Sequence, residues 1–269
     1  MEWNNGQAGR RVTRQLLNFN DWSDRVSDRM MRYFPRRRLD VRLEQPVVSF
    51  TFDDVPHSAV RSGATLLERY NARGTFYIAG GLQDKMQGEM RMFSPADVQY
   101  LARAGHEVAC HSFSHRKMSK LSREILERDL ARNKAYLDSL APQEGRLRNF
   151  AYPYNAPKWR ARNLLADRFS SCRGAGNQIN RGRVNRDFLY GVEIGGADAK
   201  FSTLSSYIED VARNPGWLIF FTHDVDDNPS PYGCTRDLFE KLVAYAAEKS
   251  CLILPVRDAM ALLQGQNKE

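Results

Sequence analysis

The stretch PVVSFTFDD, residues 46–54, is typical of a buried β-strand that ends at two adjacent aspartates. Residues 46–52 form a short, largely apolar run of the kind that parallel sheets bury on both faces. Asp53 and Asp54 follow at the carboxyl end of the predicted strand. Parallel α/β folds carry their sites at that end of their strands, so this stretch predicts both a fold class and the position of its chemistry.

Downstream of this stretch, short apolar runs alternate with amphipathic segments, which predicts parallel strands covered by helices. The expected fold class is α/β, a distorted (β/α) barrel of seven or eight parallel strands; an open doubly wound sheet is the alternative. We expect a barrel domain over residues 45–269 and a basic, helical extension over residues 1–44. Further strands are predicted at 75–79, 107–113, 147–152, 217–222 and 251–256, and less distinctly near 169–172 and 189–194; helices are predicted at 57–72, 94–105, 122–140 and 235–248.

The positive charge of the chain is concentrated in its first forty residues. The 269 residues carry a net charge of +8, and residues 1–40 hold nine arginines against five acidic residues. In this segment Trp22, Val26, Met30 and Phe34 recur at helical spacing. One interpretation is a helix that packs this apolar stripe on the barrel; another is peripheral contact with an anionic membrane or a polyanionic glycan. No nucleic-acid-binding motif is recognisable, so a specific nucleic acid is not expected.

Composition and cysteine usage predict a soluble, cytoplasmic protein. With 42% hydrophobic and 27% charged residues, the chain is not expected to be disordered over most of its length. No apolar stretch reaches the ~20 residues of a membrane-spanning helix, and the first residues lack the apolar core of a secretory signal. The four cysteines are far apart and form no CxxC pair, which favours buried thiols over disulfides or a cysteine zinc site.

Residues able to bind a metal ion follow three of the predicted strands. His111 and His115 come after one apolar run and His223 after another. Because the carboxyl ends of parallel strands share one face, these histidines are expected to converge with Asp53 and Asp54. The i, i+4 spacing of His111 and His115 lets two imidazoles face one ion, although such pairs also occur as local caps. Two imidazoles and a carboxylate leave coordination positions open, as in a catalytic site.

Four motifs, in this order, resemble those of the polysaccharide deacetylase family, carbohydrate esterase family four. They are SFTFDD at 49–54, GHEVACHSFSH at 105–115, FAYPY at 150–154 and FFTHDV at 220–225. The resemblance covers roughly residues 45–260. It implies a distorted β/α barrel that binds one divalent metal ion, usually zinc, and removes acetyl groups from N-acetylated sugars.

The resemblance also implies a role for each matching residue. Asp53 matches the catalytic base, and His223 matches the catalytic acid. Tyr154 matches the tyrosine whose backbone N–H helps to hold the oxyanion. The implied metal ligands are Asp54, His111 and His115.

Two departures from the family pattern concern the residues around Asp53. Val55 stands where the family usually has glycine, and because valine does not adopt positive φ cheaply, we expect a turn that avoids it. Ala151 stands where many members have an arginine that orients the catalytic aspartate. Arg173 is the candidate substitute for that arginine, and the alternative is a surface arginine paired with a nearby acid.

A third departure concerns His223. The family's aspartate partner for the acid histidine, with a tryptophan beside it, is not recognisable here. Asp198 or Glu193 is the candidate carboxylate.

The sequence therefore predicts a hydrolase that acts on carbon–nitrogen bonds other than peptide bonds. The expected activity is metal-dependent N-deacetylation of an amino sugar, through metal-activated water, an aspartate base and a histidine acid. A polysaccharide, an oligosaccharide and a lipid-linked or nucleotide-linked precursor are all open as substrates. The alternatives are a deformylase or cyclic-imide hydrolase on the same metal site, and a catalytically inactive sugar-binding relative.

Overall fold

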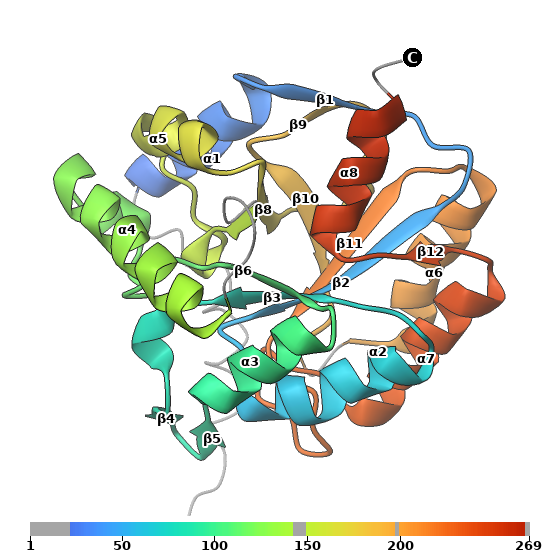
Figure 1. Ribbon diagram of the computed structural model, residues 1–269. Helices are drawn as coiled ribbons and strands as arrows, with labels where there is room; N and C mark the ends of the chain where they lie inside the picture. The colour runs from blue at the N-terminus through green and yellow to red at the C-terminus, as the bar shows by residue number, and fades with distance from the viewer. Residues whose placement is uncertain (1–21, 142–148, 197–198, 267–269) are drawn as a thin grey trace, which may run out of the picture.

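A closed barrel of parallel strands forms the centre of the computed structural model, which describes residues 22–141, 149–196 and 199–266 (Figure 1). The strand order is β11-β10-β8-β7-β6-β3-β2, and β11 pairs with β2 to close the ring. Short β12 also pairs with β2, in parallel. The predicted barrel is confirmed, and the pairing of β2 with β11 excludes the open sheet. The strands of the ring are β2 (Val47–Asp53), β3 (Thr75–Ile78), β6 (Glu107–Cys110), β7 (Asn149–Ala151), β8 (Ser171–Ala175), β10 (Leu189–Glu193) and β11 (Trp217–Thr222), and β12 (Leu252–Ile253) lies outside it.

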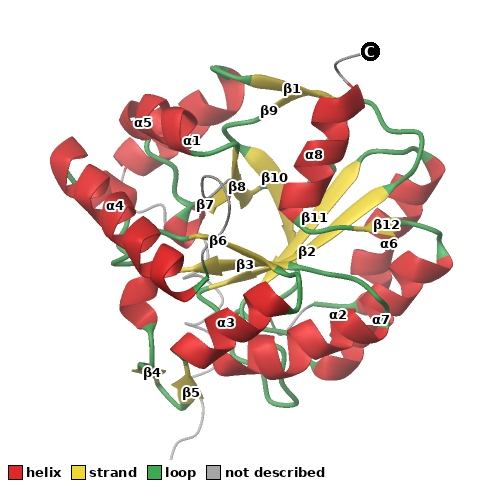
Figure 2. Ribbon diagram, in the orientation of Figure 1, coloured by secondary structure: helices red, strands yellow, loops and turns green. Residues whose placement is uncertain are grey.

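Helices surround the barrel (Figure 2). The helices α3, α4 and α7 begin at side-chain caps, Ser94, Ser122 and Thr235, which each accept a hydrogen bond from a backbone N–H of the first turn. None of the described helices is long and apolar enough to cross a membrane. The helices are α1 (Trp22–Tyr33), α2 (Thr65–Arg69), α3 (Pro95–Arg103), α4 (Arg123–Leu140), α5 (Arg162–Arg168), α6 (Phe201–Arg213), α7 (Arg236–Glu248) and α8 (Val256–Gln266), with a π-helical turn at Ala59–Ala64 before α2.

The side chains of β2 alternate between the barrel interior and the layer of helices, as the pleat of a strand requires. Phe50 and Phe52 point outward, where their rings meet Phe239 of α7 at 5.4 Å and 5.5 Å. The odd-numbered residues of β2 point into the barrel. Val47 is the first of these inward-pointing side chains and Asp53, at the carboxyl end of the strand, is the last. The alternation therefore delivers the Asp53 side chain to the inside of the barrel at its carboxyl end.

The opposite end of the barrel is closed by apolar packing. Leu39 of β1 (Arg38–Val41) packs there with Trp217 and with Val256 and Met260 of α8. Strand β1 pairs antiparallel with β9 (Gly182–Asn185), so part of the expected N-terminal extension joins a two-stranded sheet. A second small hairpin consists of β4 (Met86–Gln87) and β5 (Met90–Arg91). Because described residues fill this end of the barrel, we expect the site of the barrel at the carboxyl end.

The four cysteines are free and buried, as the sequence predicts. The strand expected over 107–113 is wrong at its carboxyl end, because β6 stops at Cys110. Ser112 has φ of 61°, which no strand accommodates. His111 therefore begins a loop, which lets the chain turn back within the next residues.

Candidate metal centre and catalytic site

Asp54, His111 and His115 lie together at the carboxyl ends of β2 and β6. Each offers one ligand atom, and these atoms all lie within 4.8 Å of one another. Asp54 Oδ1 is 2.9 Å from His115 Nε2 and 3.6 Å from His111 Nε2. This oxygen is buried and makes no hydrogen bond with any described residue. Two imidazole nitrogens and an otherwise unsatisfied carboxylate oxygen that converge in this way fit a divalent cation.

The protonation state of this cluster suits metal binding. His111 Nδ1–H donates to the carbonyl oxygen of Ala151 at 2.9 Å, which leaves the lone pair of Nε2 directed at Asp54. Burial lowers the pKa of His111 to about 4. Burial alone would raise the pKa of Asp54, but the adjacent histidines, His115 above all, outweigh it and lower that pKa. A neutral imidazole and an ionised carboxylate are the forms that bind a cation.

Strained backbone gathers at this end of the barrel. Among the described non-glycine residues with positive φ are Asp54, Val55, Ser112, His115 and Tyr154, at 48° to 61°. The expectation that the turn at Val55 avoids positive φ is therefore wrong. The Val55 side chain is fully buried and its carbonyl accepts a hydrogen bond from Phe93 N–H at 3.1 Å, so tertiary contacts hold the residue in this conformation.

Helix α4 fixes the loop that carries the two ligand histidines. Asp129 accepts hydrogen bonds from the backbone N–H of Phe113 at 2.8 Å and of Ser114 at 3.0 Å, between His111 and His115. Sequence reasoning missed Asp129, because it stands in a highly charged helix where nothing distinguishes it from a solvated acid.

Arg173 of β8 reaches Asp53 inside the barrel. Its Nη2 donates to Asp53 Oδ1, and its Nη1 donates to Asn155 Oδ1 at 2.8 Å. The guanidinium also lies over the rings of Phe221, at 4.6 Å, and Tyr77, at 5.3 Å. Both Arg173 and Asp53 are buried, so the alternative of a surface arginine is wrong. The guanidinium thus supplies the counter-charge that a buried carboxylate needs.

His223, after β11, faces the same cluster from the other side. Its Nε2 is 4.0 Å from Asp54 Oδ2, and its Nδ1 lies 3.3 Å from the carbonyl oxygen of Tyr232. Of the two candidate carboxylates, the structure describes only Glu193. Glu193 makes no hydrogen bond to His223 but interacts with it through charge: burial raises the pKa of Glu193, and the nearby His223 opposes that rise. Asp198 lies outside the described residues.

Tyr154 lies at the outer edge of the site. Its side chain is half exposed, and its ring lies 4.7 Å from that of His115. A φ of 58° turns the backbone at this position, and no hydrogen bond among the described residues uses the Tyr154 N–H. That N–H is therefore available to a ligand at the mouth of the site.

Comparison with known proteins relates this chain to carbohydrate deacetylases. Residues 40–168 match the family model of polysaccharide deacetylases. A bifunctional xylanase/deacetylase from Pseudobutyrivibrio xylanivorans is 32% identical over 78 residues, which are 29% of this chain and 12% of that protein. The peptidoglycan-N-acetylglucosamine deacetylase PgdA of Listeria monocytogenes is 31% identical over 93 residues, which are 34% of this chain and 18% of that protein. The alignments thus span less than a fifth of either relative.

The fold is shared more widely than the sequence. The crystal structure of a putative polysaccharide deacetylase from Mycobacterium smegmatis superimposes with a TM-score of 0.63 at 14% identity, covering 85% of this chain and 94% of that one. The family match includes Asp53, Asp54, His111, His115 and Tyr154, whereas Arg173 and His223 lie beyond it. Residues 40–168, just under half of the chain, are thus similar to the polysaccharide deacetylase family, and the barrel as a whole has the fold of the solved deacetylase structure.

Proposed function

We propose that this protein is a divalent-metal-dependent hydrolase that removes the acetyl group from an N-acetylated amino sugar. The observation that carries this function is the separation of two aspartates at one strand end. Asp54 joins two histidines in a cation-binding cluster, while Asp53 stays outside that cluster and pairs with Arg173. A binding module needs only the first arrangement, whereas a catalyst also needs a carboxylate outside the cation-binding cluster to act as a base.

Asp54, His111 and His115 would hold the metal ion. A bound ion polarises the amide carbonyl and lowers the pKa of water towards ~7. Zinc is the proposed ion, because two imidazoles and one carboxylate with open positions form a common catalytic zinc set. The carbonyl of Ala151, which accepts from His111 Nδ1–H, supplies the outer contact that orients such a ligand.

Asp53 acts as the general base in this proposal. It accepts a proton from the attacking water while Arg173 holds the carboxylate in place through a hydrogen bond to Oδ1. The backbone N–H of Tyr154 would donate to the oxyanion that develops on the carbonyl.

His223 acts as the general acid. Its Nδ1–H donates to the Tyr232 carbonyl, so the proton on Nε2 of the imidazolium is the one directed into the site. That proton goes to the departing nitrogen, because an amide does not expel an unprotonated amine anion.

The proposed substrate class is a glycan that contains N-acetylglucosamine. It rests on the names of the relatives, one of which is a peptidoglycan-N-acetylglucosamine deacetylase. Formamido sugars and cyclic imides would meet the same base and acid, so they remain alternatives to acetamido sugars at this site.

Acetate release and metal content test this function together. Purified protein is expected to contain about one zinc per chain and to release acetate from N-acetylglucosamine oligomers. Asp53→Asn should keep the metal and lose turnover, while Asp227→Asn, in the exposed loop after His223, should keep both. Formate or ring-opened product in place of acetate would identify the alternative substrates, and metal-free, inactive protein would indicate a sugar-binding relative.

A further inference from the structure

The apolar stripe of α1 faces outward. Trp22 is 80% exposed, Val26 38%, Tyr33 71% and Phe34, just after the helix, 59%. The interpretation that this stripe packs on the barrel is therefore wrong for Trp22 and Val26. It holds at the other end of the stripe, where Met30 is half-buried and the ring of Phe34 lies 6.3 Å from that of Trp159. Met31, at 1% exposure, is the residue that joins the core.

Polar contacts to the barrel fix which face of α1 is outside. Ser27 Oγ donates to the Pro157 carbonyl at 2.9 Å and accepts from Trp159 N–H at 2.6 Å. On the same side, Asp24 pairs with Lys117 at 3.4 Å. These contacts bury the side of the helix opposite the stripe, so the exposed aromatic residues follow from a defined orientation.

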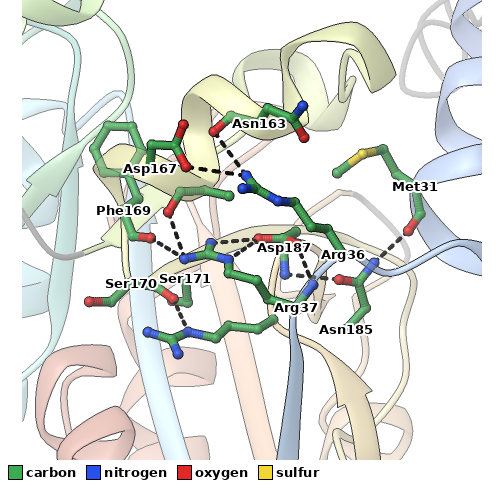
Figure 3. Close-up of polar contacts among 12 residues, drawn as sticks. Met31, Arg36, Arg37, Asn163, Asp167, Phe169, Ser170, Ser171, Asn185 and Asp187 are labelled. Carbon is green, nitrogen blue, oxygen red and sulfur yellow. Dashed lines mark hydrogen bonds and ion pairs between the residues drawn. The ribbon is translucent and has the colours of Figure 1, made fainter.

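The segment after α1 is anchored even more tightly (Figure 3). Arg37 pairs with Asp187 and donates to the carbonyl oxygens of Ala166 and Phe169, both at 2.8 Å. Arg36 donates to Asp167 Oδ1 at 3.3 Å. These two arginines serve the fold, so the positive charge available to a partner comes from other positions.

Positive charge also lies within the stripe itself. Arg29 is exposed, lies 6.0 Å from the centre of the Tyr33 ring, and lines a recess of about 330 Å³ with Val26, Met30, Tyr33 and Phe34. Exposed tryptophan and tyrosine beside arginine on an amphipathic helix are typical of segments that bind the interface of an anionic bilayer. The sequence just before the helix adds Arg10, Arg11 and Arg14.

We propose that the outer face of α1, defined by Trp22, Val26, Arg29, Tyr33 and Phe34, docks on an anionic lipid surface. Aromatic side chains would enter the headgroup region, and the arginine would contact lipid phosphates.

Docking at this face would also bring the catalytic end of the barrel towards the lipid. Asp24 binds Lys117, two residues after His115, and Ser27 binds Pro157, three residues after Tyr154. The helix therefore lies against the loops that leave the site. A membrane-associated glycan is the substrate that this arrangement would favour, but the docking does not depend on the enzymatic activity.

Sedimentation of the full chain with vesicles tests this proposal. We expect it to bind vesicles of phosphatidylglycerol and phosphatidylcholine in equal parts, and not vesicles of phosphatidylcholine alone. Trp22→Ser/Tyr33→Ser and Arg29→Glu should each reduce binding about tenfold, because they remove the interfacial anchors or reverse the charge. The matched controls Met86→Ser, exposed on β4, and Arg103→Glu, exposed at the end of α3, should bind as the wild type does.

Three results would overturn the proposal. One is no binding to anionic vesicles, and another is binding that the stripe variants leave unchanged. The third is evidence that protein covers the stripe. A dimer that Trp22→Ser/Tyr33→Ser dissociates would show that a second copy covers it, and a clear fall in the unfolding midpoint of that variant would show that the same chain does. If lipid is the partner, the free protein should not dimerise through this face, and Trp22→Ser/Tyr33→Ser should be as stable as the wild type.

Discussion

Ala151 and Arg173 are register partners on the adjacent parallel strands β7 and β8. Both belong to the barrel interior, where Ala151 packs against Tyr77 and the Arg173 guanidinium lies over the same ring. The resemblance implies an arginine at the position of Ala151. Here the guanidinium belongs instead to Arg173, at the same level on the neighbouring strand β8. Arg173 reaches Asp53 from there, so we infer that it is a positioning residue for the proposed base.

Removal of the Arg173 guanidinium should impair both activity and stability. We expect Arg173→Met to lower kcat/KM at least about 100-fold and to destabilise the fold by about 3 kcal/mol, because it leaves the buried Asp53 carboxylate without a counter-charge. The lower pH limit of kcat/KM should move upward for the same reason, and Arg173→Lys should restore part of the activity. Steady-state kinetics across a range of pH and urea unfolding measure these effects. Arg183→Met, at an exposed position of β9, is the control, and an unshifted pH profile for Arg173→Met would argue for a purely structural arginine.

Asp129 should act on metal affinity. Asp129→Ala removes the acceptor for two backbone N–H groups between the ligand histidines, so zinc affinity should fall about 10- to 100-fold. At saturating zinc, kcat should recover. Competition with a chromophoric chelator measures the affinity, and Asp138→Ala, which removes only an exposed pair with Lys134 on the same helix, should leave it unchanged. Equal affinities in the two variants would contradict the bracing role of Asp129.

The positive φ of Val55 predicts that a glycine variant at this position is more stable than an alanine variant, the reverse of the usual order. Both substitutions remove buried methyl groups, but only glycine relieves the φ of 57°, a conformation that costs other residues about 1–2 kcal/mol. Val55→Gly should therefore unfold at a higher urea concentration than Val55→Ala, although both fall below the wild type. The usual order, with alanine more stable, would show that the surrounding contacts impose no strain here.

His106 should make stability depend on pH. Its Nδ1 accepts from Gly74 N–H at 3.0 Å and its Nε2–H donates to Glu68 at 3.0 Å, so the folded protein holds the neutral ring. Burial lowers its pKa below the ordinary 6.5. As pH falls through 6.5 the unfolded chain binds a proton that the folded chain does not, and the free energy of unfolding should decrease until the lowered pKa is reached. Urea unfolding between pH 7.5 and 5 should show a smaller slope for His106→Gln than for the wild type; identical slopes would contradict this assignment.

Metal removal should destabilise the protein. A ligand present at 100 times its dissociation constant stabilises a fold by about 2.7 kcal/mol, so a chelator should lower the unfolding midpoint by several degrees. Zinc should restore it. In His115→Ala the chelator should have little effect, because one of the three ligands is gone. Thermal unfolding with and without chelator separates these cases, and a chelator effect that survives in His115→Ala would point to a different metal site.

Local chemistry made much of the fold predictable. The stretch 46–54 contains β2, and Ser94 and Asp97 form a capping box at the start of α3. Helix α4 extends to Leu140 as its predicted range does. Such features depend on neighbours a few residues apart, so spacing alone reveals them. The helix α6 escaped prediction because its serine- and threonine-rich sequence has weak helix propensity, and its buried face becomes clear only in contact with the barrel.

By itself, the sequence determined that strands alternate with helices and that aspartates and histidines follow the strand ends. Parallel strands then bring those residues to one end, whatever the details of packing. Only the tertiary structure decided that Arg173 meets Asp53 across 120 residues, that Val55 accepts positive φ, and that the stripe of α1 faces outward. Each of these depends on the free energy of contacts between segments distant in the chain. A repeat of apolar residues shows that a helix has two faces, but which of them is buried depends on the surface against which the helix packs.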